Sequence, residues 1–242
     1  MKTNQQFKNE ALDALRGNWA KAVLLTLFYY LIVSAISGPY MYQTVQMQSY
    51  LQENAHSVFQ MASLLQDPDY LALQQRSNGS SALMLLAEIL LVFPLAVGIC
   101  NAFRALLVRE DNDLIPNAFR IAFNNYWHKV WGMLWMYILI CLWTLLLIIP
   151  GIIKCFSYAM VPFILEENPE LSASESIHRS RMMMRGHKYD LFWLLLGFLG
   201  WAILCLFTFG IGFLWLIPYI QTSYAAFYEE VNADYALNGG LD

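Results

Sequence analysis

Two ionisable side chains stand inside segments that are otherwise apolar, and they are the residues best placed to do chemistry in this chain. Glu88 lies in an apolar stretch over about residues 82–105, and Lys154 lies in another over residues 151–165. A lysine at mid-bilayer costs roughly 2.5–3.5 kcal/mol, so it must be paired or reach water. We expect Glu88 and Lys154 to form an ion pair, or the long stem of Lys154 to extend to the headgroups. An ion or substrate pathway is the alternative.

Small polar residues in the apolar stretches form a second candidate group. Its members are Asn101, Ser157, Tyr158, Gln221, Ser223 and Tyr224. Side chains of this kind usually join membrane helices through hydrogen bonds of about 0.6 kcal/mol each. The alternative is that they line a polar cavity with pseudo-threefold symmetry.

A basic segment near the last third of the chain forms the third group, and its members are Arg179, Arg181, Arg185 and Lys188. We expect this segment to contact anionic lipid headgroups, with Met182–Met184 supplying apolar contact. The histidines are scattered without metal-ligand spacing, and no HExxH, GxSxG or P-loop string occurs. The sequence therefore predicts no enzyme, no metal, no cofactor and no nucleic-acid partner.

Composition places these residues in a membrane protein. Hydrophobic residues make up 58% of the chain and charged residues 13%, against roughly 45–50% and about 25% in soluble domains. Several uncharged stretches reach the roughly 20 residues that span a hydrocarbon core. Since only helices and closed barrels satisfy their backbone groups in lipid, we predict an all-α polytopic helical bundle forming one membrane domain over residues 1–242. Four cysteines in the apolar stretches are expected to be small buried hydrophobes.

Helix breakers and apolar runs divide the chain into six predicted membrane helices and three amphipathic segments. The first span ends at Gly38-Pro39, the third and fourth are joined by a turn at Pro150-Gly151, and the last two by Gly210. The predicted spans are 20–37, 82–105, 130–149, 151–165, 191–209 and 211–228. The amphipathic segments are 1–19, 110–129 and 170–189, and capping boxes at Thr3-Gln6 and Ser172-Glu175 mark the first and third.

Residues 41–81 form a polar, glutamine-rich insertion between the first two spans. Val58, Phe59, Ala62 and Leu65 have helical spacing, which predicts a short amphipathic helix. Asn78-Gly79-Ser80 is read as a turn. Of the 14 lysines and arginines, only Arg76 in this insertion falls on the predicted outer face, and only Lys154 falls within a span. The positive-inside rule therefore predicts cytoplasmic termini and an outward-facing insertion.

The three amphipathic segments are variants of one unit. Each is followed by a helix breaker, a polar residue and an aromatic anchor, in the strings 15–19, 123–127 and 184–189. The even-numbered spans each place a short polar string downstream of Pro94, Pro150 or Pro218. We predict three repeats of surface helix plus membrane hairpin, related by an axis along the membrane normal.

Five strings resemble one family of bacterial membrane proteins. They are Leu15–Trp19, Ile149–Lys154, Ser157–Pro169, Ser180–Lys188 and Gly210–Gln221. In these strings the chain is similar to the domain-of-unknown-function 975 family. The resemblance implies an integral membrane protein of the bacterial inner membrane, without an established activity or catalytic residues to carry over.

Taken together, these features predict a non-enzymatic inner-membrane protein. We expect it to bind lipid or a membrane partner, including a second copy of itself, in an envelope or secretion process. The alternative is a small transporter or channel with a polar path between the repeats. A dry, well-packed bundle would favour the first function, and a water-accessible polar path would favour the second.

Overall fold

The computed structural model describes residues 2–54, 63–64, 66–109 and 111–237. Helices make up 86% of it, and the described residues include no strand. Five helices are long and apolar enough to cross a membrane: Trp19–Asn54, Pro68–Arg109, Tyr126–Leu146, Ile148–Glu167 and Lys188–Phe207. The all-α class is thereby confirmed, and these apolar helices indicate a multi-pass membrane protein.

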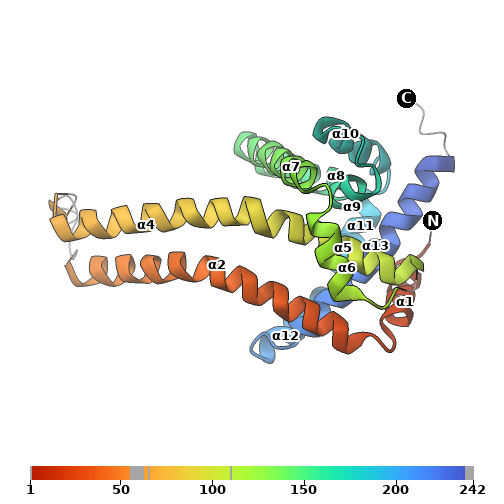
Figure 1. Cartoon of the computed structure of the whole chain (residues 1–242), viewed down its shortest axis with the longest axis horizontal. Helices are drawn as coiled ribbons and strands as arrows, with labels where there is room; N and C mark the ends of the chain where they lie inside the picture. The colour runs from red at the N-terminus through yellow and green to blue at the C-terminus, as the bar shows by residue number, and fades with distance from the viewer. Residues whose placement is uncertain (1, 55–62, 65, 110, 238–242) are drawn as a thin grey trace. The chain divides into compact units, whose positions relative to one another are not determined.

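The chain divides into two compact units, residues 29–92 and residues 1–28 with 93–242. The first contains most of α2 (Trp19–Asn54), α4 (Pro68–Ala87) and the π-helix η1 (Glu88–Val92). α2 and α4 lie side by side as a hairpin (Figure 1), with the rings of Tyr50 and Tyr70 6.5 Å apart. The insertion 41–81 is thus largely helical where it is described. The predicted amphipathic helix around Val58 and Leu65 lies outside the described residues.

Two predicted breaks in this unit are wrong. Gly38-Pro39 does not end the first span, because α2 continues through Pro39 to Asn54. A residue before proline resists helical geometry partly through its Cβ, which Gly38 lacks. Asn78-Gly79-Ser80 lies within α4 rather than in a turn. There Ser80 and Ser81 donate hydrogen bonds to the helical carbonyls of Arg76 and Ser77, so the serines do not interrupt the helix.

The other unit is a bundle built around three of its helices. Its helices are α1 (Asn4–Leu15), α5 (Phe93–Arg109), α6 (Leu114–Phe123), α7 (Tyr126–Leu146), α8 (Ile148–Ser157), α9 (Val161–Glu167), α10 (Ala173–Met183), α11 (Lys188–Leu196), α12 (Leu199–Phe207) and α13 (Phe213–Leu237). α5, α9 and α13 pack together at the centre. Phe103, Phe163 and Phe227, one from each, are fully buried.

The amphipathic helices α1, α6 and α10 pack into this bundle by their apolar faces. Phe7, Ala11 and Leu15 of α1 are fully buried against α13 and α5. Both predicted capping boxes, at Thr3-Gln6 and Ser172-Glu175, are present. The expectation that Met182–Met184 supply apolar contact with lipid is wrong for Met183 and Met184, which are buried in the core. Their apolar partner is the protein itself.

The turn between the third and fourth predicted spans lies before the predicted Pro150-Gly151. Leu147, in an extended conformation, ends α7 and begins α8, and Pro150 lies in the first turn of α8, where a missing N–H costs little. Gly151 serves close packing instead, since a Cβ there would lie 2.4 Å from Oγ1 of Thr144. Gly210, with φ +86°, does form the predicted turn between α12 and α13.

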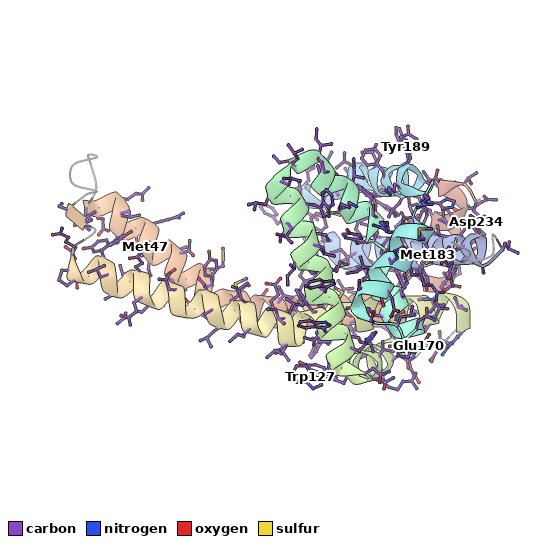
Figure 2. The ribbon with its side chains drawn as sticks, turned by 90° about the horizontal axis from the view of Figure 1, so that it is seen from above. Met47, Trp127, Glu170, Met183, Tyr189 and Asp234 are labelled. Carbon is purple, nitrogen blue, oxygen red and sulfur yellow. The ribbon has the colours of Figure 1, made fainter. Side chains whose placement is uncertain are left out.

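Large apolar side chains cover the outside of the bundle. Leu145 is 88% exposed and Phe207 is 79% exposed, and Ile148, Ile149 and Leu206 resemble them. An apolar surface this continuous is unfavourable in water but suits a lipid environment. Exposed Trp127 and Tyr189 lie at the surface of this unit (Figure 2), as expected of aromatic rings at a membrane interface.

Candidate functional site

The break between α8 and α9 is the centre of the intramembrane polar site. Helical structure is interrupted at Tyr158–Met160, and Pro162, near the start of α9, has no N–H to donate. The backbone N–H groups of Val161 and Phe163 bond to carbonyls only three residues back. The carbonyls of Ser157 and Ala159 are therefore left outside the helical ladder and need other donors.

Side chains from three other helices supply the missing hydrogen bonds. Ser180 of α10 donates to the carbonyl of Ser157 (3.0 Å) and accepts from the N–H of Met160 (3.2 Å). Tyr224 of α13 donates its hydroxyl hydrogen to the carbonyl of Ala159. Asn101 of α5 donates to the carbonyls of Pro162 (2.9 Å) and Val97 (3.0 Å). Buried polar groups are thus used to hold a broken helix in place.

The structure brings together part of the predicted polar group. Asn101 and Tyr224 meet the break formed around Ser157 and Tyr158, as the preceding contacts show. Gln221 instead accepts a weak hydrogen bond from the thiol of Cys100 at 3.4 Å. The hydroxyl of Ser223 is buried and has no hydrogen-bond partner in the described part of the chain.

Ser180 was not predicted, although a signal for it exists in the sequence. Ser176 and Ser180 occupy the apolar face of α10 together with Ile177 and Met183, and both serines are fully buried. A polar residue on the apolar face of an amphipathic helix must find a partner in the core. That position in the helical pattern was the available signal.

A second polar site lies where α7 begins and α9 ends. Lys129 is fully buried, and its ammonium lies 2.6 Å from the carboxylate of Glu166. The same ammonium donates to the carbonyl of Asn124 at 2.7 Å and to the carbonyl of Ile121. A buried charge needs such complete partnering to be tolerated. Lys129 therefore joins α6, α7 and α9 at one point.

Arg104 of α5 forms the neighbouring part of this polar site. Its guanidinium pairs with Glu167 of α9 at 3.1 Å and with Glu229 of α13. Glu167 also accepts a hydrogen bond from the hydroxyl of Tyr228. The helices α5, α9 and α13 are thus linked by one network of charges.

The acidic pair Glu166-Glu167 could have been recognised from the sequence. Two carboxylates at the C-terminal end of a helix meet the negative end of its dipole, which is unfavourable without cations nearby. The candidate partners Arg104 and Lys129 are distant in the sequence, so the pairing itself required the fold.

The basic segment around α10 has a different character. Arg181 and Arg185 are exposed, Arg179 and Lys188 are half-buried, and Arg181 contacts His178 at 3.3 Å. Arg179 lies 5.8 Å from the ring of Tyr235. In the described part of the chain, none of these four cations forms an ion pair with a carboxylate.

The start of α10 is fixed by a charged cap. The carboxylate of Glu175 accepts a hydrogen bond from the backbone N–H of Ser172 at 2.7 Å, and the hydroxyl oxygen of Ser172 accepts one from the backbone N–H of Glu175. Hydrogen bonds from the side chain and backbone of Ser172 lower the pKa of the Glu175 carboxyl. The Glu175 carboxyl group of this cap is therefore fully ionised at neutral pH.

Lys154 lies over the rings of Trp143 (4.5 Å) and Tyr158 (5.9 Å). It is also near enough to Arg181 and Lys188 to be repelled by both. Glu88 lies in η1, in the other compact unit. The predicted ion pair between Glu88 and Lys154 stays a prediction.

Two cavities border α13. One of about 680 Å³ lies between α1, α5 and α13 and is lined by charged side chains that include Lys2, Glu10 and Glu229. Lys2 is already paired with Glu10 at 2.9 Å and with Glu230. The other, of about 340 Å³, is mainly apolar and lies between α8, α11 and α13.

Residues 80–235 match the family described as "Protein of unknown function (DUF975)". The chain belongs to this family. The match begins within α4 and includes η1, α5 and every later helix through most of α13, so both polar sites lie inside it. The similar string Leu15–Trp19 lies outside the matched residues. No curated protein and no solved structure matches the chain.

Proposed function

We propose that this member of the DUF975 family is a non-enzymatic protein of the bacterial inner membrane that binds anionic lipid headgroups through its α10 segment. The observation that carries the proposal is the set of cations without carboxylate partners, Arg181, Arg185 and Lys188, in the described part of the chain. Lys129 and Arg104, by contrast, are both held in ion pairs. Cations left at the surface of a membrane protein attract acidic headgroups.

The aromatic residues beside this segment support a position at the membrane interface. Tyr189 is 66% exposed and Trp193 is 44% exposed, and their rings are in edge-to-face contact at 5.7 Å. Both lie on α11, Tyr189 directly after Lys188 and Trp193 about one turn further along. Exposed tyrosine and tryptophan favour the headgroup level of a bilayer. Arg185 and Lys188 would then lie at the height of the lipid phosphates.

We further propose three repeats, each a surface helix followed by a membrane hairpin, with α13 as the sixth span and both termini in the cytoplasm. Left-handed residues separate each surface helix from its hairpin: Gly17, Asn125 and Gly186. A polar contact also joins the two arms of each hairpin at the end opposite its turn. These contacts are Lys21 with the carbonyl of Asn112, Lys129 with Glu166, and His187 with Asp234.

Reporter tags test this topology directly. Tags at the two termini should report the cytoplasm, and a tag near Gln66 should report the outside. A fusion series that places Gln66 and the C-terminus on the same side of the membrane would contradict the arrangement.

The lipid proposal is tested by binding of fluorescent phosphatidylglycerol to the purified full-length protein in detergent. Since each basic residue near an anionic surface contributes about 1 kcal/mol, replacing Arg181, Arg185 and Lys188 with glutamine should weaken binding by roughly a hundredfold. The matched control replaces Arg16, Arg109 and Arg120, three other exposed arginines. Equal affinities for the native protein and the α10 variant would refute the proposal.

An envelope or secretion role, and a membrane-protein partner or second copy, belong to this same proposal. The second candidate function is a small transporter or channel. It is favoured by buried polar atoms without hydrogen-bond partners in the described residues, namely Oδ1 of Asn101 and Oγ of Ser223. Reaction of a cysteine placed at Ser223 with a membrane-impermeant thiol reagent would favour transport, and lack of reaction would favour the lipid-binding protein.

A further inference from the structure

The apolar cavity between α8, α11 and α13 is an intramembrane groove. Its volume of about 340 Å³ falls within the roughly 300–1,000 Å³ of typical ligand sites. Its lining residues are Cys155, Phe156, Ala159, Leu191, Leu195, Ile220, Gln221 and Tyr224. Tyr224 and Gln221 already bond to Ala159 and Cys100 within the protein. The groove therefore offers mainly apolar surface to an occupant.

The groove opens on a lipid-facing surface. Leu195 at its edge is 38% exposed, and the neighbouring Leu196 and Phe192 are 37% and 42% exposed. In a bilayer, these side chains contact hydrocarbon rather than water. An acyl chain is the molecule available at this depth to fill the groove.

Three cations lie on the helices in and beside the walls of the groove: Lys154 on α8, Arg181 on α10 and Lys188 on α11. Lys154 directly precedes Cys155 of the lining. Lys188 lies on the same face of α11 as Leu191 and Leu195, because residues at i, i+3 and i+7 align on a helix. Arg181 is held beside the break by its neighbour Ser180, which bonds to Ser157 and Met160.

Lys154 lies one helical turn before Ser157, whose carbonyl accepts the hydrogen bond of Ser180 next to Arg181, and both Arg181 and Lys188 repel Lys154 electrostatically. No carboxylate in the described part of the bundle unit pairs with any of them. Like charges brought together without a counter-ion are unfavourable, and an anion placed among them relieves this repulsion. A phosphate group has the charge and the acceptor oxygens for all three side chains.

We infer that the groove holds one acyl chain of an anionic phospholipid whose phosphate lies among Lys154, Arg181 and Lys188. The inference rests on the proposed lipid-binding function and gives it one specific site. It differs from a diffuse attraction to headgroups because it requires both the groove and Lys154, which the α10 surface alone does not.

The first test uses a matched pair of leucines in the phosphatidylglycerol binding assay. Leu195→Trp places a larger ring in the groove, whereas Leu196→Trp makes the same change on an equally exposed neighbour that does not line it. We expect Leu195→Trp to weaken binding by about tenfold and Leu196→Trp to leave it unchanged. Lys154→Gln should weaken it by about fivefold.

The second test uses cysteines that the chain already contains. Cys155 lines the groove, and Cys141 is equally classed as exposed but lies elsewhere, on α7. Phosphatidylglycerol added to the native protein in detergent should slow the reaction of Cys155 with N-ethylmaleimide and leave that of Cys141 unchanged. Peptide mass spectrometry measures the two rates separately, and phosphatidylcholine serves as the control lipid.

The outcomes separate this site from the broader proposal. If the Arg181, Arg185 and Lys188 variant loses binding but both tryptophan variants and Lys154→Gln match the native protein, the lipid function stands and the groove site is wrong. Equal protection of Cys141 and Cys155 would also overturn the site. If excess inorganic phosphate displaces the lipid completely, the cations bind free phosphate, and the acyl-chain inference fails.

Discussion

Of all single substitutions that remove a charged group from this unit, replacing Lys129 with methionine should destabilise the bundle most. Methionine keeps the length of the apolar stem but removes the ammonium that Glu166 and the carbonyls of Ile121 and Asn124 share. Because Lys129 is fully buried, water cannot replace it at all of these positions. The loss therefore leaves a carboxylate and two backbone acceptors without their donor.

The magnitude follows from these contacts. Removing one partner of a buried ion pair costs about 3–5 kcal/mol. The side chain of Glu166 is 23% exposed, so solvent relieves part of its charge. Each unsatisfied acceptor adds about 1–3 kcal/mol where it stays dry. We expect a loss of about 3–5 kcal/mol in the free energy of unfolding, with hydration of Glu166 offsetting part of the carbonyl cost.

The assay is reversible unfolding in mixed micelles, followed by the fluorescence of the eight tryptophans. Lys21→Met is the matched control, since Lys21 makes a single exposed hydrogen bond to the carbonyl of Asn112 at 3.0 Å. It should cost about 0.5–1.5 kcal/mol at most. In a double-mutant cycle, Lys129→Met combined with Glu166→Gln should cost less than the sum of the two single changes by about 1–3 kcal/mol.

The reasoning fails if Lys129→Met lies within 1 kcal/mol of the control variant, an outcome that would mean water or another group replaces the ammonium. It also fails if the cycle shows no coupling between Lys129 and Glu166. In that case the ion pair would not be what joins α7 to α9.

Two further predictions concern packing and the helix break. Gly98→Ala should destabilise the protein by about 1–3 kcal/mol, because a Cβ at Gly98 would lie 2.2 Å from the carbonyl oxygen of Ala118. Gly200→Ala, a helical glycine with open space around it, should be neutral or stabilising in the same unfolding assay, and equal effects would show that α5 and α6 are not so closely packed. Ser180→Ala should cost about 1–3 kcal/mol by leaving the Ser157 carbonyl and the Met160 N–H unpaired, while Ser174→Ala, on the exposed face of α10, should cost little. Accelerated amide exchange at Met160 in Ser180→Ala alone would confirm the role of this hydroxyl, and unchanged exchange would contradict it.

Local signals in the sequence predicted the parts of this fold that depend on one or two helical turns. The capping boxes at Thr3 and Ser172 and the turn at Gly210 were predicted correctly, because each is formed by neighbouring residues. The helical membrane class followed from apolar stretches that cannot be buried in any other way in lipid. The sequence also marked Lys154 as unusual, since a charge in an apolar stretch is costly wherever its partners are.

Other features needed the tertiary structure. Gly38-Pro39 was expected to end a helix, yet α2 passes through it, because one lost hydrogen bond does not outweigh the helix on either side. Gly151 was expected to form a turn but instead permits close contact with Thr144. Local propensity does not distinguish these cases, since each depends on what lies beside the residue in space.

The candidate site shows the same division. The sequence placed Asn101, Tyr158 and Tyr224 in apolar stretches but did not bring them to one broken helix, and it did not single out Ser180 at all. The partners of Lys129 and Arg104 come from helices far along the chain. Residue types therefore determined that this is a helical membrane protein with costly internal charges, whereas the packing of α5, α7, α9 and α13 determined which charges are neutralised in ion pairs.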